Sequence, residues 1–425
     1  MGTVFKGAKL IPGSGNEAID NSLLIVNGST IEYAGQFDES ICKKKVEEGY
    51  QIIDCSGKSI TPGFIDCHVH LCGILSENVR DWVLEPNEQQ AIVSTVEAWK
   101  VISAGVTTVG DVSENGLRLK KLIKEGSIPG PEIVACGRGF CRTGGYIDCS
   151  DIPVNVINES HPWAIIVNGK ENIRKQTRLL IRKNADAVKI WPSSSGASPY
   201  RLRDTDQLYS LDEIKMAVDE AAMLKLPVFA HCESVEGTKA ALKAGVQNII
   251  HGEELDEECL ELFLEKGACL MPTLKITLDW LNYDYDEIPR RINIEKYDGN
   301  TINEKEYNRV VDNFMTAYSR GIKIALASDT FCQKMTPYGH NSLDEIKEMV
   351  KAGMSPLDAI TASTKNGAEA MGLGDKKGVL EEGKDADFII MDIDPLTEMD
   401  KLSSLVIEEV WKQGKKIKKG GDQYV

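Results

Sequence analysis

The chain has 425 residues, of which 42% are hydrophobic and 27% are charged, which is the composition of a soluble folded protein. This length exceeds one ordinary core, unless that core is a large α/β barrel with a small added domain. The net charge of −16 argues against nucleic acid or an anionic membrane as the partner.

Neither a membrane helix nor a secretory signal is expected from the sequence. No run approaches the roughly 18 apolar residues that a membrane helix needs, and the first residues lack a basic segment followed by an apolar one. Eleven cysteines are scattered singly without a C-x-x-C pair, which fits a reduced compartment better than a disulfide framework. We therefore expect a cytoplasmic protein.

Residues 1–61 have the pattern of short strands separated by turns, with a tight-turn signal at Asn27-Gly28. From residue 63 onward, strands alternate with helices. The candidate strands are 63–70, 106–111, 132–140, 187–191, 228–232, 248–252, 269–274 and 322–329. Eight such units within about 310 residues favour a closed (β/α)8 barrel, whose active site lies at the carboxyl ends of its strands.

Several helices between these strands have recognisable start signals. The segments Ser210–Glu213 and Ser342–Glu345 both match a capping box, in which a serine and a glutamate satisfy free N–H groups reciprocally. Pro356 follows Ser355 at a position where a helix start tolerates proline.

After residue 376 the sequence returns to strands that resemble the N-terminal segment. We predict a small β-sandwich domain formed by residues 1–61 and 377–425, beside a barrel of residues 62–376. Two insertions, 141–168 and 275–302, are longer than ordinary connections and should lie over the active-site face.

Histidines mark the mouth of the predicted barrel. In "TPGFIDCHVHLCG", residues 61–73, His68 and His70 are two positions apart on a strand and so point to the same face. His231 and His251 end the fifth and sixth strands, and Asp329 ends the eighth, where a carboxylate would be costly unless paired or coordinating. Four of the six histidines therefore stand at strand ends, which predicts a metal site.

Lys189 ends the fourth strand in "ADAVKIWP". A lysine at a strand end usually extends its ammonium into solvent. A cation aimed at a metal site would be repelled, so this lysine fits only if it is neutral or converted to an anion.

The chain resembles the amidohydrolase superfamily, specifically its imidazolonepropionase-like branch with metal-dependent Xaa-Pro and Xaa-Arg dipeptidases (prolidase-like enzymes). The resemblance covers nearly the whole chain. It is carried by "PGFIDCHVH", "GVTTVGDV", "AVKIW", "VFAHCESVEGTKAALKAGV", "IIHG", "LASDT" and "GVLEEGKDADFIIMD".

This resemblance implies two divalent metal ions, usually zinc, bridged by a carbamate that Lys189 forms with CO2. The more buried ion would take His68, His70, Lys189 and Asp329, and the second would take Lys189, His231 and His251. A hydroxide bridging the two ions would attack the amide carbonyl, with Asp329 as the catalytic proton carrier. Imidazolonepropionases lack the lysine, so its presence favours the binuclear peptidase-like group.

The resemblance also suggests substrate-binding residues. Tyr146 stands where many relatives have the histidine of a T-G-G-H segment, and Tyr209 matches a tyrosine of the dipeptidase pocket. Position, rather than the resemblance, suggests the others: Arg142, with Arg138, Arg201 and Arg203, lies on predicted loops or strand ends at the active-site face and could bind a substrate carboxylate. His340 lies just after the last strand and could touch the substrate. Gly110 stands where relatives often have arginine. Each of these residues could instead have an ordinary packing or surface role.

The first interpretation is therefore a metal-dependent hydrolase that cleaves the amide bond of a small N-acyl amino acid or dipeptide. Hydrolysis of a cyclic amide, an imidazolone or another non-peptide amide with the same metals is the alternative. A non-catalytic paralogue is a remote third, since all six ligands are present. By analogy with related barrels we also expect a homo-oligomer.

Overall fold

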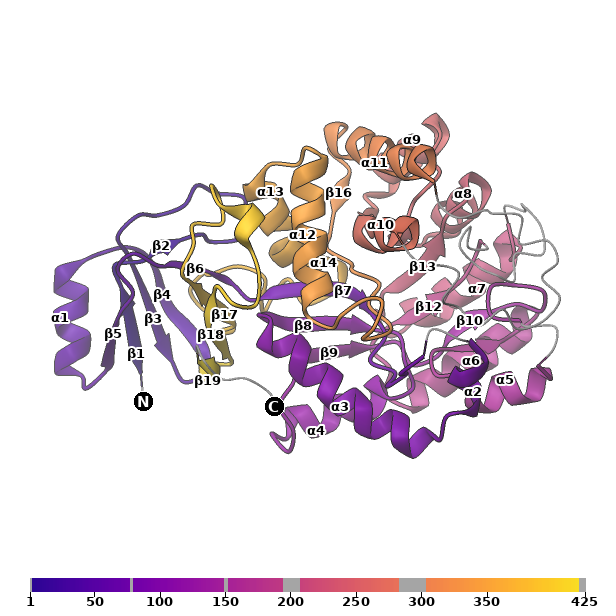
Figure 1. Cartoon of the computed structure of the whole chain (residues 1–425), viewed down its shortest axis with the longest axis horizontal. Coiled ribbons are helices and arrows are strands. Elements are labelled where there is room, and N and C mark those ends of the chain that lie inside the picture. Colours follow the sequence, from indigo (N-terminus) through magenta and orange to yellow (C-terminus); the bar gives the residue numbers. More distant parts are fainter. Residues whose placement is uncertain (1, 77–78, 149–151, 194–206, 283–302, 420–425) are drawn as a thin grey trace.

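Strands from both ends of the chain meet in one β unit, shown in the computed structural model of Figure 1, which describes residues 2–76, 79–148, 152–193, 207–282 and 303–419. The unit holds two sheets, with strand orders β4-β3-β1-β5 and β19-β18-β17-β6-β2. The strands of the first sheet are β1 (Thr3–Lys6), β3 (Ser22–Asn27), β4 (Thr30–Gln36) and β5 (Gln51–Asp54). Those of the second are β2 (Lys9–Leu10), β6 (Ser59–Pro62), β17 (Phe388–Met391), β18 (Ile407–Lys412) and β19 (Lys415–Lys419).

The two sheets pack face to face through aromatic side chains. The Phe5 ring of β1 lies 5.0 Å from that of Phe388 and 5.1 Å from that of Trp411, both in the second sheet. The predicted turn at Asn27-Gly28 joins β3 to β4, with Gly28 at a φ of 61°. Helix α1 (Glu39–Glu47) lies at the outer end of this unit (Figure 1). The β unit from both termini is thus confirmed, while its limits at residues 61 and 377 stay predictions.

Parallel strands form the barrel, in the orders β7-β8-β9 and β11-β10-β12-β13-β14-β15-β16. They are β7 (Phe64–Val69), β8 (Val106–Asp111), β9 (Glu132–Ala135), β10 (Gly139–Cys141), β11 (Ala164–Ile166), β12 (Val188–Ile190), β13 (Val228–Cys232), β14 (Asn248–His251), β15 (Cys269–Met271) and β16 (Lys323–Ile324). Backbone hydrogen bonds close the ring: Cys67 N–H donates to the Leu326 carbonyl at 2.8 Å, and Asp329 N–H to that of His68 at 2.9 Å. The expected α/β barrel fold is confirmed.

One predicted strand, 132–140, is in fact two. Gly137 adopts a φ of 67°, a left-handed conformation that interrupts the strand between β9 and β10. Beyond the break, β10 pairs with β12 and also with β11, a strand within the segment that the sequence analysis treated as an insertion. The eighth strand is shorter than predicted, because regular pairing ends at Ile324.

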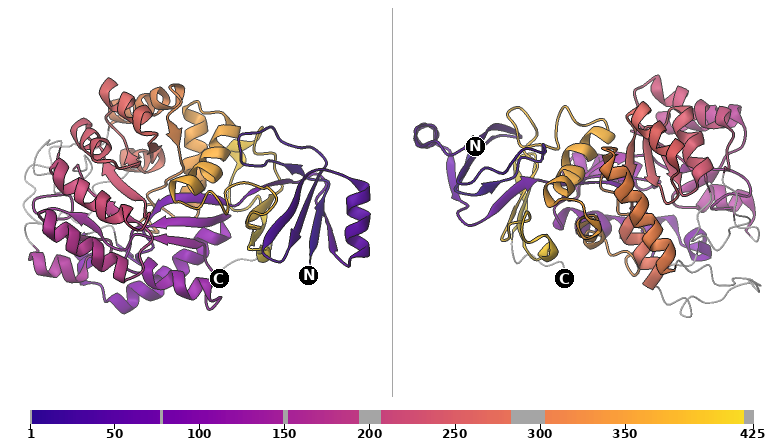
Figure 2. Two further views of the ribbon diagram at one scale, coloured as in Figure 1. Left: turned by 180° about the vertical axis from the view of Figure 1, so that it is seen from behind. Right: turned by 90° about the horizontal axis from the view of Figure 1, so that it is seen from above.

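Helices cover the outside of the barrel (Figures 1 and 2). The longer ones are α3 (Asn87–Ser103), α4 (Gly116–Lys124), α6 (Lys170–Arg182), α7 (Leu211–Ala222), α8 (Val235–Ala244), α9 (Glu257–Lys266), α10 (Leu274–Asn282), α11 (Glu304–Ser319) and α12 (His340–Ala352). Short ones are α2 (Val79–Leu84), α5 (Val154–Ser160), α13 (Pro356–Thr361), η1 (Ala362–Asn366), α14 (Gly367–Ala370) and η2 (Met399–Lys401). Within the described ranges, no helix has the length and apolar character needed to cross a bilayer.

Two of the three predicted helix starts are confirmed, and the third is wrong. Ser210 and Glu213 form the predicted capping box of α7, and Ser355 caps α13 with Pro356 at its start. The capping box predicted at Ser342 is wrong, because α12 begins earlier, at His340. Ser342 instead donates to Asp66 of β7 at 2.7 Å, which ties the helix to a barrel strand.

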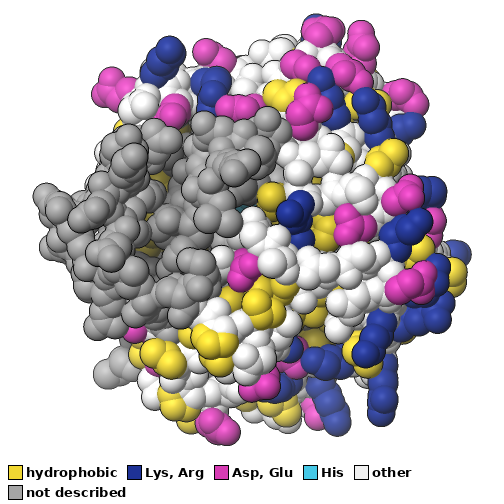
Figure 3. All heavy atoms as spheres, turned by 90° about the vertical axis from the view of Figure 1, so that its right-hand side faces the viewer, with side chains coloured by type: hydrophobic (Ala, Val, Ile, Leu, Met, Phe, Trp, Pro, Cys, Tyr) yellow, Lys and Arg dark blue, Asp and Glu magenta, His cyan; other side chains and the backbone are white. Residues whose placement is uncertain are grey.

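The barrel opens away from the β unit. Strand β6 of that unit leads into β7 after a single residue, Gly63, so the amino ends of the parallel barrel strands face the β unit. Their carboxyl ends lie on the opposite side of the molecule. On that side, acidic and basic side chains are interspersed with hydrophobic ones over the coloured surface in Figure 3.

Candidate metal centre

The predicted ligands converge at the carboxyl ends of the barrel strands. His68 lies in β7 and His70 directly follows that strand, and single residues come from β12, β13, β14 and the segment after β16: Lys189, His231, His251 and Asp329. The four histidines and the lysine are buried, and Asp329 exposes 20% of its side chain. Strand alternation thus directs all six into one space, as the sequence spacing indicated.

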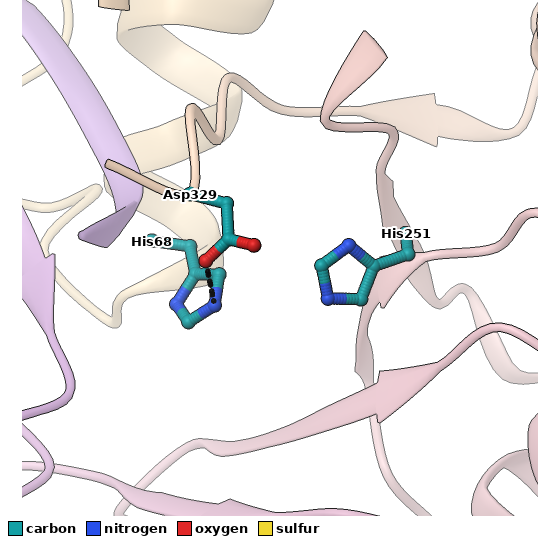
Figure 4. Close-up of side chains that lie close together, drawn as sticks. All are labelled: His68, His251 and Asp329. Carbon is teal, nitrogen blue, oxygen red and sulfur yellow. Dashed lines mark ion pairs between the residues drawn. The ribbon is translucent and has the colours of Figure 1, made fainter. Parts of the chain in front are cut away.

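Asp329 joins His68 and His70. Its Oδ1 lies 3.1 Å from Nε2 of His68 and 3.1 Å from Nε2 of His70. Lys189 Nζ lies 3.4 Å from His68 Nε2. Figure 4 shows the Asp329 carboxylate between the imidazoles of His68 and His251, and ligand atoms of these three residues lie within 4.8 Å of one another.

A second group lies on the side of β13 and β14. The His231 and His251 rings are 4.4 Å apart, and His231 Nε2 is 3.4 Å from Oε1 of Glu233. Ligand atoms of these three residues also lie within 4.8 Å of one another. The sequence analysis missed Glu233, although its position two residues after His231 directs it to the same face.

Several nitrogens in this centre lack a partner within the described part of the chain. They are His68 Nδ1, His231 Nε2 and His251 Nε2, all buried. A buried polar atom left unsatisfied costs about 1–3 kcal/mol, so this arrangement requires something that the side chains themselves do not supply. Imidazole nitrogens beside a carboxylate are a donor set that suits a divalent ion such as zinc.

Burial keeps His231 and His251 in the neutral form that binds metal. Burial, with the neighbouring His251 and Lys189 adding to it, lowers the pKa of His231 well below its usual value. Burial likewise lowers the pKa of His251 to about 3. Burial alone would raise the pKa of Asp329, but His68 and His70 outweigh it and hold that pKa well below its usual value. Neutral imidazoles and an ionised carboxylate both present lone pairs to an ion.

Lys189 is fully buried, and burial lowers its pKa to about 8. The carboxylate of Asp329 opposes this shift. The ammonium lies over the ring of Trp191, with Nζ 5.1 Å from the ring centroid. The lower pKa increases the uncharged fraction of this lysine near neutral pH, and the uncharged amine is the nucleophilic form.

Hydrogen bonds behind the ligands fix their ring orientations. The Val112 carbonyl can only accept, so Nδ1 of His70 donates to it at 2.9 Å and leaves the Nε2 lone pair facing Asp329. The Tyr338 hydroxyl donates to the His70 carbonyl at 2.6 Å. Nδ1 of His251 is 2.8 Å from the Thr273 hydroxyl. Such partners select the tautomer that a metal ligand needs.

The backbone is strained at the same place. His251, Thr273 and Asp329 have φ values of 74°, 51° and 51°, in the left-handed region that residues with a side chain seldom occupy. Strain of this kind costs of order 1–3 kcal/mol at each residue and clusters at functional sites.

Comparison with known proteins agrees with this geometry. The sequence model of the amidohydrolase family matches residues 59–417. The chain belongs to the amidohydrolase family. The resemblance inferred from the sequence motifs is therefore confirmed, and the chain is a hydrolase of a family that is generally metal-dependent.

Relatives match this amidohydrolase over nearly its full length. Ochratoxinase of Aspergillus niger is 28% identical over 443 residues, covering 99% of this chain and 87% of the relative. Its crystal structure has a TM-score of 0.87 at 26% identity, covering 99% and 96%. A Xaa-Pro dipeptidase with methionine bound in its active site has a TM-score of 0.82 at 25% identity, covering 98% and 100%. An imidazolonepropionase of Rhizobium rhizogenes is 23% identical over 433 residues, covering 93% of each chain.

Of the four predicted substrate-binding residues, Tyr146 lies at the metal centre of this amidohydrolase. Its ring is 5.3 Å from that of His231 and stacks on Trp191 at 6.2 Å and 11°. Tyr209 is buried, and its hydroxyl donates to the Val167 carbonyl at 2.7 Å. The contacts of Tyr209 are those of a packing residue, so a substrate role for it stays a prediction.

The other predicted residues lie elsewhere. Arg142 is exposed and donates to the carbonyls of Leu208 at 2.7 Å and Thr143 at 3.0 Å. His340 is exposed as the first residue of α12. Arg201 and Arg203 lie outside the described residues. Substrate contacts by Arg142 and His340 therefore stay predictions.

Arg138 and His161 line a separate cavity of about 100 Å³ beside the starts of α3 and α4. Arg138 donates to the Asn158 carbonyl at 2.6 Å. His161 is buried, and its Nδ1 accepts from the backbone N–H groups of Trp163 and Ala164 at 3.4 and 3.3 Å. Neither residue belongs to the metal centre.

Proposed function

We propose that this amidohydrolase cleaves the amide C–N bond of a small N-acyl amino acid or dipeptide with two divalent metal ions, zinc being the expected metal. The observation that carries the proposal is the convergence of six candidate ligand residues around buried imidazole nitrogens that have no hydrogen-bond partner among the described residues. The binuclear assignment rests on the two adjacent groups of donor atoms, which share His251.

The residues divide between two ions. His68, His70, Lys189 and Asp329 would hold the first ion, and Lys189, His231 and His251 the second. Glu233, 3.4 Å from His231, adds negative charge beside the second position. Lys189 can serve both ions only as an anion. Its neutral Nζ would form an N–C bond with CO2 and lose one proton, which gives a carbamate with two oxygen donors.

When bound, divalent ions at such a centre lower the pKa of water and polarise the scissile carbonyl. Asp329 accepts the proton released as water attacks, since its carboxylate stays ionised and partly exposed. It then delivers that proton to the departing nitrogen, so water and amide yield a carboxylic acid and an amine. Tyr146 contacts the substrate on the side of His231.

The experiment is amino-acid release from a panel of dipeptides and N-acyl amino acids by protein purified with zinc and supplied with bicarbonate. We expect release from a coherent subset of the panel. Asp329→Asn should lower kcat/KM on that subset by at least about a hundredfold, because it removes the proton acceptor. Unchanged hydrolysis by Asp329→Asn would contradict the mechanism.

If protein that holds two metals released no amino acid from any member of the panel, peptide-like substrates would instead be excluded. Cyclic amides, imidazolones and other non-peptide amides would then be tested at the same centre. A small-molecule substrate is common to both alternatives, while a homo-oligomeric assembly and a cytoplasmic location stay predictions.

A further inference from the structure

Aromatic side chains gather around the metal centre. The chain has six tryptophans, and four of them lie in rows of contacting rings that begin at its ligands: Trp82, Trp163, Trp191 and Trp280. The segments that carry them are α2, β11 with its preceding residue, the end of β12, and α10. Four separate parts of the sequence therefore supply rings to one region.

One row of rings leads outward from β7. The Trp163 ring lies 4.7 Å from His70, and the Phe331 ring lies 6.2 Å from Trp163. Trp280 stacks on Phe331 at 6.5 Å and 16°. Phe331 follows Asp329 by two residues, so this row begins at the ligands and ends at Trp280, which is only partly buried. We call Trp163, Phe331 and Trp280 the aromatic row.

A second set of aromatic rings lies beside His231. Tyr146, also partly buried, lies 5.3 Å from His231 of β13 and is parallel to Trp191. Aromatic rings therefore adjoin the candidate ligands at two places, His70 and His231.

The described arginines considered for a substrate carboxylate already have backbone partners. Arg142 and Arg138 both donate to backbone carbonyls, and Arg138 lines the separate cavity. A free carboxylate on the substrate gains little from either. An aromatic group on the substrate would gain contacts with these rings beyond the apolar area that it buries.

We propose that the natural substrate is a largely apolar amide that carries an aromatic group, which binds against Trp280, the partly buried end of the aromatic row, with Phe331 and Trp163 buried behind it. This inference rests on the proposed function and narrows it to one chemical class. Apolar walls with a few placed polar groups are the usual composition of a small-molecule site. Here the polar groups are the metal ligands, and the aromatic row supplies the selectivity.

Four substrates test this proposal on the zinc-loaded wild type: N-benzoyl-phenylalanine, N-benzoyl-alanine, N-acetyl-phenylalanine and N-acetyl-alanine. We expect at least one aromatic member to exceed N-acetyl-alanine in kcat/KM by about tenfold or more. The corresponding carboxamides should keep this preference, because the described site offers no carboxylate partner. Equal kcat/KM for all four would overturn the inference, whereas no cleavage of any would count against the proposed function instead.

Substitutions at Trp280 test whether the aromatic row causes the preference for aromatic substrates. Trp280→Leu should reduce the ratio of aromatic to aliphatic kcat/KM by about tenfold, and Trp280→Phe should restore most of it. Trp99→Leu, in α3 and outside the aromatic row, is the matched control and should keep the wild-type ratio. An unchanged ratio in Trp280→Leu, with metal content equal to that of wild type, would show that the aromatic row does not select the substrate.

Discussion

At the scale of single residues, His161 shows how burial sets the charge of a side chain. Burial, with a further contribution from Arg138, lowers its pKa to about 3. An unfolded chain would bind a proton at this residue near pH 6.5, while the folded chain stays unprotonated until about pH 3. The unfolded state therefore binds more protons in this window, and the free energy of unfolding falls as pH falls from 6.5 toward 3.

We predict that this loss is smaller in His161→Gln. Between pH 6.5 and 5, wild type should lose about 2 kcal/mol more free energy of unfolding than the variant, at 1.36 kcal/mol per pH unit. Urea unfolding at each pH measures it. His340→Gln, at an exposed histidine, is the control and should follow wild type. If the free energy of unfolding changed with pH equally in His161→Gln and in wild type, the assignment of this pH dependence to His161 would be contradicted.

The convergence of the candidate metal ligands was predictable from sequence because each position depends on a local rule. The two-residue period of a strand orients His68 and His70, and an apolar run that ends in a polar residue marks Lys189 and Asp329. The residues of the site that the sequence did not predict depend on contacts between distant segments of the chain. Trp163 of the aromatic row packs on His70 from 93 positions away in sequence, which no local pattern reveals.

At the scale of elements, Gly110 explains how closely β7 and β8 approach. A Cβ built on Gly110 would lie 2.3 Å from the Cys67 carbonyl oxygen, closer than any real contact. The pairing of the two strands is irregular here, with register shifts beside Asp66. The departure from the arginine of relatives therefore has a steric basis, because this pair of strands leaves no room for a side chain.

We predict that Gly110→Ala forces β7 away from β8. The substitution should lower the free energy of unfolding by about 1–3 kcal/mol, which is the usual effect of overpacking. It should also weaken zinc binding, because β7 carries His68 and leads directly into His70. Thermal unfolding and zinc titration measure both effects.

Thr108→Val is the control in the same strand. The Thr108 hydroxyl is buried without a partner in the structure, so a methyl group should replace it at little cost. If Gly110→Ala matched this control in both measurements, the close approach of the strands would be disproved.

The presence and order of the barrel strands were easier to predict than the residues at which each strand begins and ends. The βα alternation determined the barrel, but the break at Gly137 and the pairing of β11 depend on which backbone partners are available. Ser342 likewise matched a helix start by its own sequence, yet Asp66 on a distant strand competes for its hydroxyl. In each case, contacts with distant parts of the chain determined where the strand or helix begins and ends.

At the scale of the whole molecule, a buried ion network joins the barrel to the β unit. Lys377, with 2% of its side chain exposed, lies 2.8 Å from Asp387 and 3.4 Å from Asp385 and also pairs with Glu132 of β9. Burial would lower the pKa of Lys377, but the carboxylates outweigh it and raise that pKa. One cation thus compensates three carboxylates whose oxygens lie within 4.8 Å of one another.

We predict that Lys377→Met lowers the free energy of unfolding by about 3–5 kcal/mol, since it removes the cation 2.8 Å from the buried carboxylate of Asp387. Lys401→Met is the control, because Lys401 is 58% exposed and its surface pair with Glu398 should contribute little to stability. Denaturant unfolding at one fixed zinc concentration compares the two. Equal effects would mean that the network does not hold the two parts together.

The central claim is that Lys189 completes a binuclear metal centre. Zinc bound per chain, measured by elemental analysis after loading with zinc and bicarbonate and removal of excess metal, tests it most directly. The account predicts about two ions per chain in wild type and at most about one in Lys189→Ala, because the variant lacks the ligand shared by both ions. Wild type that holds no more than one ion, or Lys189→Ala that still holds two, would contradict it.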